Sequence, residues 1–202
     1  MSDAAPSRSA ILELRDERQA MVEGHAFLDE KCLAIAAEIV RELARYAELE
    51  KRFLAASQAA SRALQAALAR HGLAELGLLP APAAPAIALR GASRSVMGVP
   101  LLDASLAQPP PEPEVPAWGS PEARACHAAF AVLLALAPGI GATAGNLERL
   151  SEEYRRSIRR ARALDDVLIP EAARELRAME TALEDLKRED AIAMRLGARG
   201  AI

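Results

Sequence analysis

Large aromatic side chains are scarce in this chain of 202 residues. Phenylalanine, tryptophan and tyrosine together make up 3% of the sequence, and alanine is its commonest apolar residue. Aromatic rings supply much of the buried area of thick protein cores. Their scarcity argues against such a core and favours a slim pairing of helices.

Cysteine is also rare, and the charge balance is close to neutral. Cys32 and Cys126 are far apart and form no C-x-x-C motif, which is typical of reduced thiols in the cytosol. The first nine residues have no apolar run behind a basic start and therefore do not predict a secretory signal. A net charge of −3 and a pI near 5.7 predict no binding of nucleic acid or anionic lipid.

The sequence lacks a pattern of catalytic or metal-binding residues. Its three histidines and two cysteines are too scattered for a zinc site. Segment 139–145 is similar to a phosphate-binding loop, but it has no Gly-Lys-Ser/Thr ending and follows no predicted strand. The acidic pairs Asp165–Asp166 and Glu189–Asp190 have no accompanying histidine, serine or glycine-rich loop. We therefore predict that the chain is not an enzyme and binds no cofactor, metal or nucleotide.

A long amphipathic helix is predicted from Ser9 to the break signal at His71–Gly72. Two heptad columns, which begin at Leu14 and Arg18, are mostly apolar over about eight repeats. Three polar residues interrupt the columns, namely Arg18, His25 and Glu42. Polar residues in a coiled-coil seam typically fix its register. The repeat predicts a coiled-coil seam along the whole stretch.

A second helical pattern covers residues 147–196, where apolar residues recur at gaps of mostly three or four. A helix of this length extends about 75 Å, so it must lie against another helix or protrude. Pro170 lies in its middle and removes a backbone N–H, which predicts a helix kink there.

Residues 125–146 carry no formal charge, which raises the alternative of a membrane span of about 20 residues. Only 130–136 are strongly apolar, and proline and glycines follow, so we predict no span. We expect the second helix to begin near Pro121, to be kinked or interrupted around Pro138–Gly139, and to resume near Asn146.

Between the two helical patterns, prolines recur from residue 80 to residue 116 and forbid a continuous helix. Short strands are predicted at Ala86–Leu89 and Ser95–Leu102, and the proline run 108–116 reads as a linker. We divide the chain into an N-terminal helix (1–72), a proline-rich insert (73–120) and a C-terminal helix (121–202).

Two motifs in the C-terminal part resemble the signature of a known family. Segment 157–170 reads Ser-Ile-Arg-Arg-Ala-Arg-Ala-Leu-Asp-Asp-Val-Leu-Ile-Pro, and Arg188-Glu189-Asp190 follows after less than twenty residues. This resembles the D subunit of the V/A-type ATPases, the central rotor shaft. Ala161 and Arg162 depart from the family's Val-Asn. The positions that match are Ser157, Arg159, Arg160, Ala163, Leu164, Val167, Ile169, Pro170, Arg188, Glu189 and Asp190.

The first helix adds to this resemblance through Gly24, Leu28 and Lys31, whereas Cys32 and Leu33 replace a basic and an acidic residue. Glycine inside a helix costs about 1 kcal/mol relative to alanine. Gly24 therefore indicates either a close approach of another backbone or mere tolerance.

The resemblance implies an all-α fold, a long antiparallel two-helix coiled coil whose insert carries a small β-hairpin at the turn. It implies a non-catalytic rotor that transmits torque between the catalytic hexamer and proton or sodium translocation in the membrane sector. The implied partners are the hexamer of catalytic A and regulatory B subunits, the small F subunit of the central stalk, and the funnel-like C subunit, which leads to the membrane ring. Such a rotor is cytoplasmic and peripheral to the membrane. The alternative is a free-standing coiled-coil adaptor or assembly chaperone.

The candidate contacts between this rotor and the hexamer are charged. They comprise a basic belt on two successive helical turns and the triplet of the second motif, namely Arg155, Arg156, Arg159, Arg160 and Arg162, and Arg188, Glu189 and Asp190. A solvated face, balanced by Glu152 and Glu153, is the other interpretation of the belt.

Overall fold

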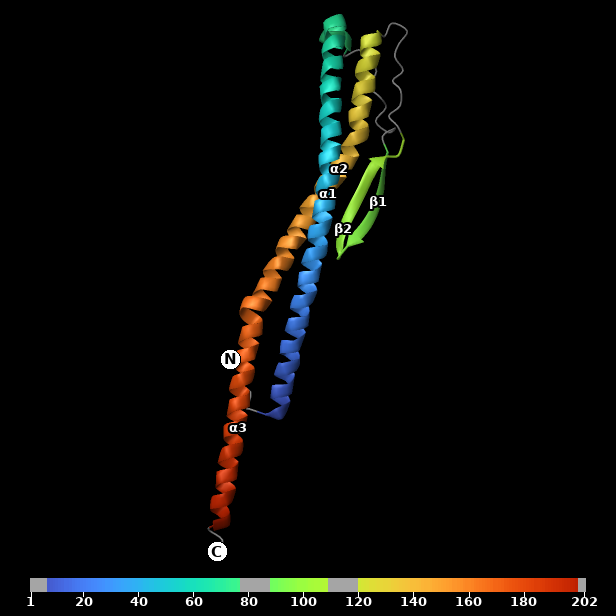
Figure 1. Ribbon diagram of the computed structural model, residues 1–202. Helices are drawn as coiled ribbons and strands as arrows, with labels where there is room; N and C mark the ends of the chain where they lie inside the picture. Colours follow the sequence, from blue (N-terminus) through green and yellow to red (C-terminus); the bar gives the residue numbers. More distant parts are fainter. Residues whose placement is uncertain (1–6, 77–87, 109–119, 200–202) are drawn as a thin grey trace. The chain divides into compact units, whose positions relative to one another are not determined.

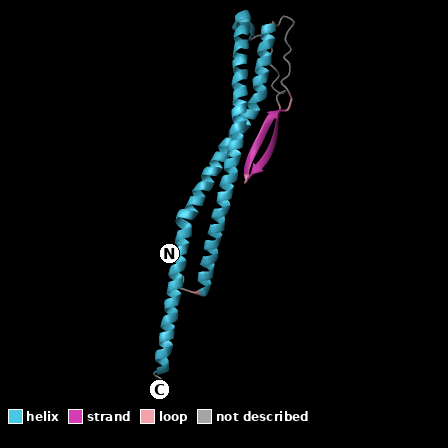
Figure 2. Cartoon of the chain, in the orientation of Figure 1, coloured by secondary structure: helices cyan, strands magenta, loops and turns pink. Residues whose placement is uncertain are grey.

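The computed structural model describes residues 7–76, 88–108 and 120–199. Its elements follow the chain as two helical courses with two strands between them (Figure 1). They are α1 (Arg8–Leu76), β1 (Leu89–Val96), β2 (Val99–Leu106), α2 (Pro121–Ala163), the π-helical turn η2 (Leu164–Leu168) and α3 (Ile169–Arg199). Figure 2 shows how little of the described chain is not helix. The fold is the expected all-α coiled coil with a β-hairpin insert.

The chain forms two compact units. The terminal unit comprises residues 1–33 and 155–202, and the hairpin unit comprises residues 34–154. The division into 1–72, 73–120 and 121–202 stays a prediction, because much of the insert lies outside the described residues.

In the hairpin unit, α1 and α2 run antiparallel. Glu42 contacts Asn146, and further along α1 His71 contacts Ser120, the residue before α2. The core contains Ile35 and Leu150, both with no exposed surface, together with Val99 and Leu101 of β2. The apolar face of the hairpin thus completes the core that the two helices begin.

In the terminal unit, the first turns of α1 lie antiparallel to α3. Arg15 forms an ion pair with Glu180 at 2.5 Å, and Gly24 lies near Leu164. Small or apolar residues are buried here, among them Ile11, Ala161 and Ala172. Across both units, every member of the two predicted heptad columns is at least half-buried except Arg18, which is exposed. The predicted seam is confirmed.

The predicted strand boundaries were wrong. The strands pair antiparallel from Leu89–Leu106 to Val96–Val99, so the expected strand Ser95–Leu102 spans the turn between them. Met97 and Gly98 form this turn with φ of 49° and 83°, the two positive values that a two-residue type I′ hairpin requires. Of the other expected strand, Ala86 and Ile87 lie outside the described residues.

Of the kink or interruption expected near Pro138–Gly139, the interruption was wrong, because α2 is continuous from Pro121 to Ala163, and the kink stays a prediction. A proline keeps helical φ and removes one hydrogen bond, so packing can hold it in a helix. Here Gly139 packs close to the Ala104 carbonyl and the Leu49 side chain. The expected start at Pro121 is confirmed. In α1 the geometry breaks at Gly72 (φ 71°, ψ 169°), and the helix then extends to Leu76.

Pro170 is the second residue of α3, two positions after Leu168, the last residue of the π-helical turn η2. In this turn the N–H of Ile169 donates to the carbonyl of Leu164, five residues back instead of four. The proline therefore sits where the helical hydrogen-bond ladder has already changed its spacing. The predicted kink at Pro170 stays a prediction.

Among the described residues, one helical stretch, Pro121–Leu196, is long and apolar enough to cross a membrane by length and composition alone. A single stretch of this kind is weak support for a span, since helices of soluble proteins pass the same test.

Candidate functional site

The basic belt lies on the last turns of α2, in the terminal unit. Its five arginines, Arg155, Arg156, Arg159, Arg160 and Arg162, are all exposed. Ser157 and Ala161, on the same turns, are buried, so the belt faces away from the packed side of the helix. Arg156 has an interaction within the chain. The other four make no hydrogen bond or ion pair with the part of the chain that the structure describes.

The triplet Arg188, Glu189 and Asp190 lies on α3 and is also exposed. Arg188 forms ion pairs with Asp185 at 3.1 Å and Glu184 at 3.6 Å, both on its own helix. About seven helical turns separate Arg162 from Arg188. The structure therefore does not bring the belt and the triplet together, and their role as contacts stays a prediction.

Sequence reasoning missed a buried polar cluster that fixes the hairpin to α1. Glu38 and Glu42, one turn apart, are each only 2% exposed. Arg94 of β1 donates through Nη2 to Glu38 Oε1 and, at 2.9 Å, to Glu42 Oε1. Arg41 binds the other oxygen of Glu38, through Nε at 2.9 Å. The hydrogen bond from Arg94, together with that from Arg41, lowers the pKa of the Glu38 carboxyl despite its burial.

The other strand is fixed to α2 by an asparagine that imitates a backbone peptide. Asn146 Oδ1 accepts a hydrogen bond from the Leu102 N–H at 2.8 Å, and its Nδ2 donates to the Leu102 carbonyl at 2.9 Å. Arg149 donates to the Pro100 carbonyl at 3.0 Å and to Asn146 Oδ1 at 2.7 Å. We call Glu38, Glu42, Arg94, Asn146 and Arg149 the hairpin clamp.

Only part of the clamp could be predicted from the sequence. Glu42 was visible as a polar interruption of the heptad seam, a pattern typical of register-fixing residues. Arg94 stands in a polar strand whose pairing partner is not local. Its contact with residues more than fifty positions away could not be read from spacing.

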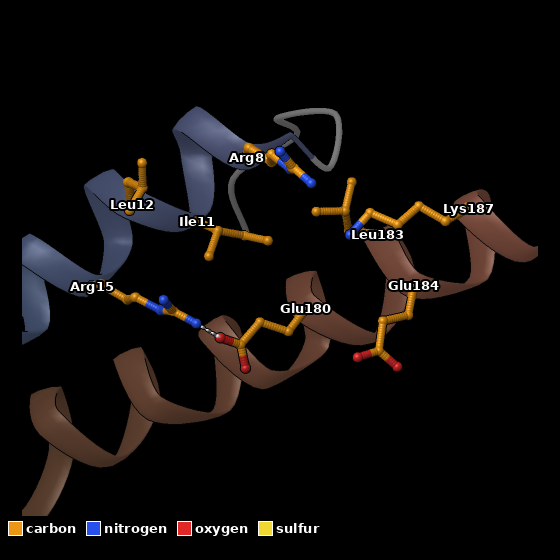
Figure 3. A pocket seen from close by; sticks show the side chains of 8 residues that line it. All are labelled: Arg8, Ile11, Leu12, Arg15, Glu180, Leu183, Glu184 and Lys187. Atoms are coloured by element: carbon orange, nitrogen blue, oxygen red, sulfur yellow. Dashed lines mark hydrogen bonds and ion pairs between the residues drawn. The ribbon is translucent and has the colours of Figure 1, made fainter.

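An open groove of about 490 Å³ lies between the first turns of α1 and the middle of α3, in the terminal unit (Figure 3). Figure 3 shows Arg15 reaching across it to Glu180, while Ile11 and Leu183 supply apolar walls. The ion pair spans the groove, and its lining residues include no serine, cysteine or histidine.

Metal-binding and redox-active groups are not assembled in the described segments. No group of three or more His, Cys, Asp or Glu side chains is placed there to hold a metal ion. Cys32 and Cys126 are free thiols, and burial raises the pKa of each, which makes the thiolate form rarer.

Comparison with known proteins gives a consistent result along almost the whole chain. A family model for the D subunit of ATP synthase matches residues 10–196. A V-type ATP synthase D subunit from Anaeromyxobacter dehalogenans strain 2CP-1 is 33% identical over 205 aligned residues, which cover 96% of this chain and 95% of that protein. One from Thermotoga neapolitana is 24% identical over 189 residues, with 92% of each chain covered.

Proposed function

From the premise that this chain belongs to the ATP synthase D-subunit family, we propose that it is a non-catalytic central-stalk rotor subunit. It transmits torque between ATP hydrolysis or synthesis in the catalytic hexamer and proton or sodium translocation in the membrane sector. As the D subunit of a V-type ATP synthase, it is part of a multi-subunit complex that is associated with a membrane.

The observation that carries the proposal is the pair of long helical courses. α1 has 69 residues, and a continuous helical course of α2, η2 and α3 returns along it in each of the two units. Two helices that interlock along a seam resist twisting more than a single helix, since a twist must shear the packed side chains. The clamp adds a fixed hairpin to this pair. A shaft needs this mechanical property and no nucleotide or ion site.

The finer placement follows from the same proposal. Both termini insert into the hexamer of A and B subunits, and the end with the insert holds the F subunit and rests on the C subunit. The chain is then cytoplasmic and peripheral to the membrane, with no span of its own. The basic belt lies in the terminal unit, which is the part that the proposal brings to the hexamer.

Rotation of the chain inside the assembled complex is the direct test. In a Cys32→Ser, Cys126→Ser background, the exposed Ser61 of α1 is changed to cysteine and labelled with a bead. We expect ATP-dependent stepwise rotation of the bead on an immobilised hexamer, and none with the background chain that lacks the new cysteine. A bead that stays still during ATP turnover would contradict the proposal.

Co-purification tests the alternative of an adaptor or assembly chaperone. A tagged chain that is a rotor stays in the finished, ATP-hydrolysing complex. A chaperone binds the subunits only before assembly is complete, so its absence from the finished complex would favour that alternative.

A further inference from the structure

The two edges of the hairpin differ in how their backbone groups are satisfied. The N–H of Ala107 donates to the carbonyl of Ala88, which identifies 88 and 107 as a hydrogen-bonded pair. Antiparallel pairs alternate, so Arg90, Ala92, Arg94 and Val96 also bond to β2. The N–H and C=O groups of the residues between them, Leu89, Gly91, Ser93 and Ser95, point away from β2.

On the β2 side, the outward groups nearest the turn, those of residues 100 and 102, are already bonded to α2. Leu102 has both its N–H and its C=O bonded to Asn146, and the Pro100 carbonyl accepts from Arg149. Proline at position 100 has no N–H to offer. The helix α2 thus closes this edge in the way that a neighbouring strand would.

On the β1 side, no described residue bonds to the outward backbone groups. Residues 89–95 are all exposed. The clamp nevertheless holds the strand in place through Arg94, so the edge is both open and fixed. An open edge of this kind is the template on which an extended peptide adds as a further strand.

The charges on β1 select the kind of strand that fits. Its charged residues are Arg90 and Arg94, and it has no acid. Arg94 is neutralised by Glu38 and Glu42, whereas Arg90 is exposed and pairs with no acid among the described residues. Pairing with a second copy of β1 would bring further arginines to the same sheet, and like charges on adjacent strands are unfavourable. A strand with an acidic side chain beside Arg90 is favourable.

We propose that the outer edge of β1 is a docking site for an extended, acid-bearing segment of another subunit of the complex, which adds as a third strand. The assignment of the segment to a subunit rests on the proposed function. The addition itself rests on the open edge and on Arg90.

Amide hydrogen exchange in the assembled complex tests this proposal at single-residue resolution. In the isolated chain, we expect fast exchange at the outward amides of 89, 91, 93 and 95 and slow exchange at the inward amides of β1. On assembly, the outward amides should slow by about tenfold or more, because each gains an acceptor. The inward amides serve as the internal control for a folded hairpin.

A matched pair of variants tests the same edge. Ser93→Pro removes an outward N–H and leaves the β1–β2 hydrogen bonds intact, whereas Ser93→Ala keeps the N–H. We expect the proline variant to lose the protection at 91 and 95 and to hold the partner about tenfold more weakly, and the alanine variant to behave as the parent. If fast exchange of the inward amides shows that the proline variant unfolds the hairpin, a second pair of variants, Arg90→Glu and Arg90→Lys, replaces it. We then expect weaker binding of the partner for Arg90→Glu alone.

The outcomes are distinguishable. A chain that joins the complex but keeps fast outward amides overturns strand addition and leaves the rotor function in place. A chain that does not join the complex overturns the rotor function and this docking with it. Outward amides already slow in the isolated chain overturn the assignment to another subunit. Dependence on chain concentration then points to a second copy, and independence to a segment of the same chain.

Discussion

Gly24 occupies a helical position in α1 that has room for a side chain. An added Cβ would meet only Leu164 Cδ1, at 4.0 Å, which is an ordinary van der Waals contact. The interpretation of this glycine as a close backbone approach was therefore wrong, and tolerance explains it. We expect Gly24→Ala to raise the free energy of unfolding by about 1 kcal/mol, because alanine loses less backbone entropy in a helix.

Urea unfolding of the isolated chain, followed by circular dichroism, measures this change. Gly98→Ala is the matched control, since Gly98 also has open space but has φ of 83°. Alanine is strained there, so this variant should lose about 1 kcal/mol. A loss of stability in both variants would mean that the Gly24 site is tighter than the structure indicates.

Arg94 is the residue through which the clamp holds β1. Arg94→Ala leaves Glu42 without its nearest cation and Glu38 with Arg41 alone, in a site where both carboxylates are buried. We expect a loss of about 2–3 kcal/mol, most of it the cost of an incompletely paired buried charge. Arg90→Ala, on the same strand, removes an unpaired exposed cation and should change stability by less than about 0.5 kcal/mol. Equal effects of the two variants would contradict the clamp.

The lowered pKa of Glu38 makes the clamp sensitive to acid. A carboxyl whose pKa is lower in the folded state adds stability above the unfolded value, about 4.3 for glutamate, and loses it as pH falls through the folded value. We therefore expect the stability difference between the parent and Glu38→Gln to be largest near neutral pH. It should shrink as pH falls below about 4, since the parent carboxyl is then protonated as well.

The check is a series of unfolding curves between about pH 7 and about pH 3. Glu48→Gln, on the exposed side of α1, provides the reference, because it makes the same chemical change away from the clamp. A Glu38→Gln difference that stays constant across the series would mean that the ion pair with Arg94 contributes no net stability.

At the scale of elements, the sequence predicted what depends on local spacing. The heptads starting at Leu14 gave α1 and its buried face, and proline density gave the position of the insert. The sequence did not predict the turn at Met97–Gly98, because β1 is polar and lacks the alternation of apolar residues that marks a strand. Pro138 was wrongly read as a possible break, since α2 runs through it, and Gly139 lies close to Ala104 of the hairpin and Leu49 of α1, neighbours that no local pattern contains.

The two faces of α1 should respond differently to the same truncation. Ile35 is fully buried against Leu150, whereas Val40, little more than a turn away, is 66% exposed. We expect Ile35→Ala to cost about 3 kcal/mol, from lost apolar burial and a cavity in the core of the hairpin unit. Val40→Ala should cost less than about 0.5 kcal/mol. The denaturant concentrations at the unfolding midpoints of the two variants measure this difference. Similar midpoints would contradict the assignment of Ile35 to the buried seam and of Val40 to the exposed face.

At the scale of the whole molecule, the chain combines tightly bound charges with loosely held ones. In the hairpin clamp, Arg94 binds two buried carboxylates and Arg149 binds the Pro100 carbonyl and Asn146, whereas the arginines of the basic belt are exposed. A rotor that binds the surrounding hexamer strongly in one orientation would stop there. Exposed ion pairs contribute less than about 1 kcal/mol each, so they can form and break as the shaft turns.

Reversing the belt should therefore weaken coupling without unfolding the chain. We expect the double variant Arg159→Glu, Arg160→Glu to lower ion transport per ATP hydrolysed by about two- to fivefold in the reconstituted complex, because acidic groups on the hexamer then meet acids. Arg174→Glu, Arg177→Glu makes the same change in net charge at exposed positions of α3 outside the belt, and we expect a smaller defect there than for the belt variant. The defect should diminish at high salt, since screening reduces repulsion between exposed charges. If both double variants uncouple equally, net charge and not the belt is responsible, and if neither does, the belt is a solvated face.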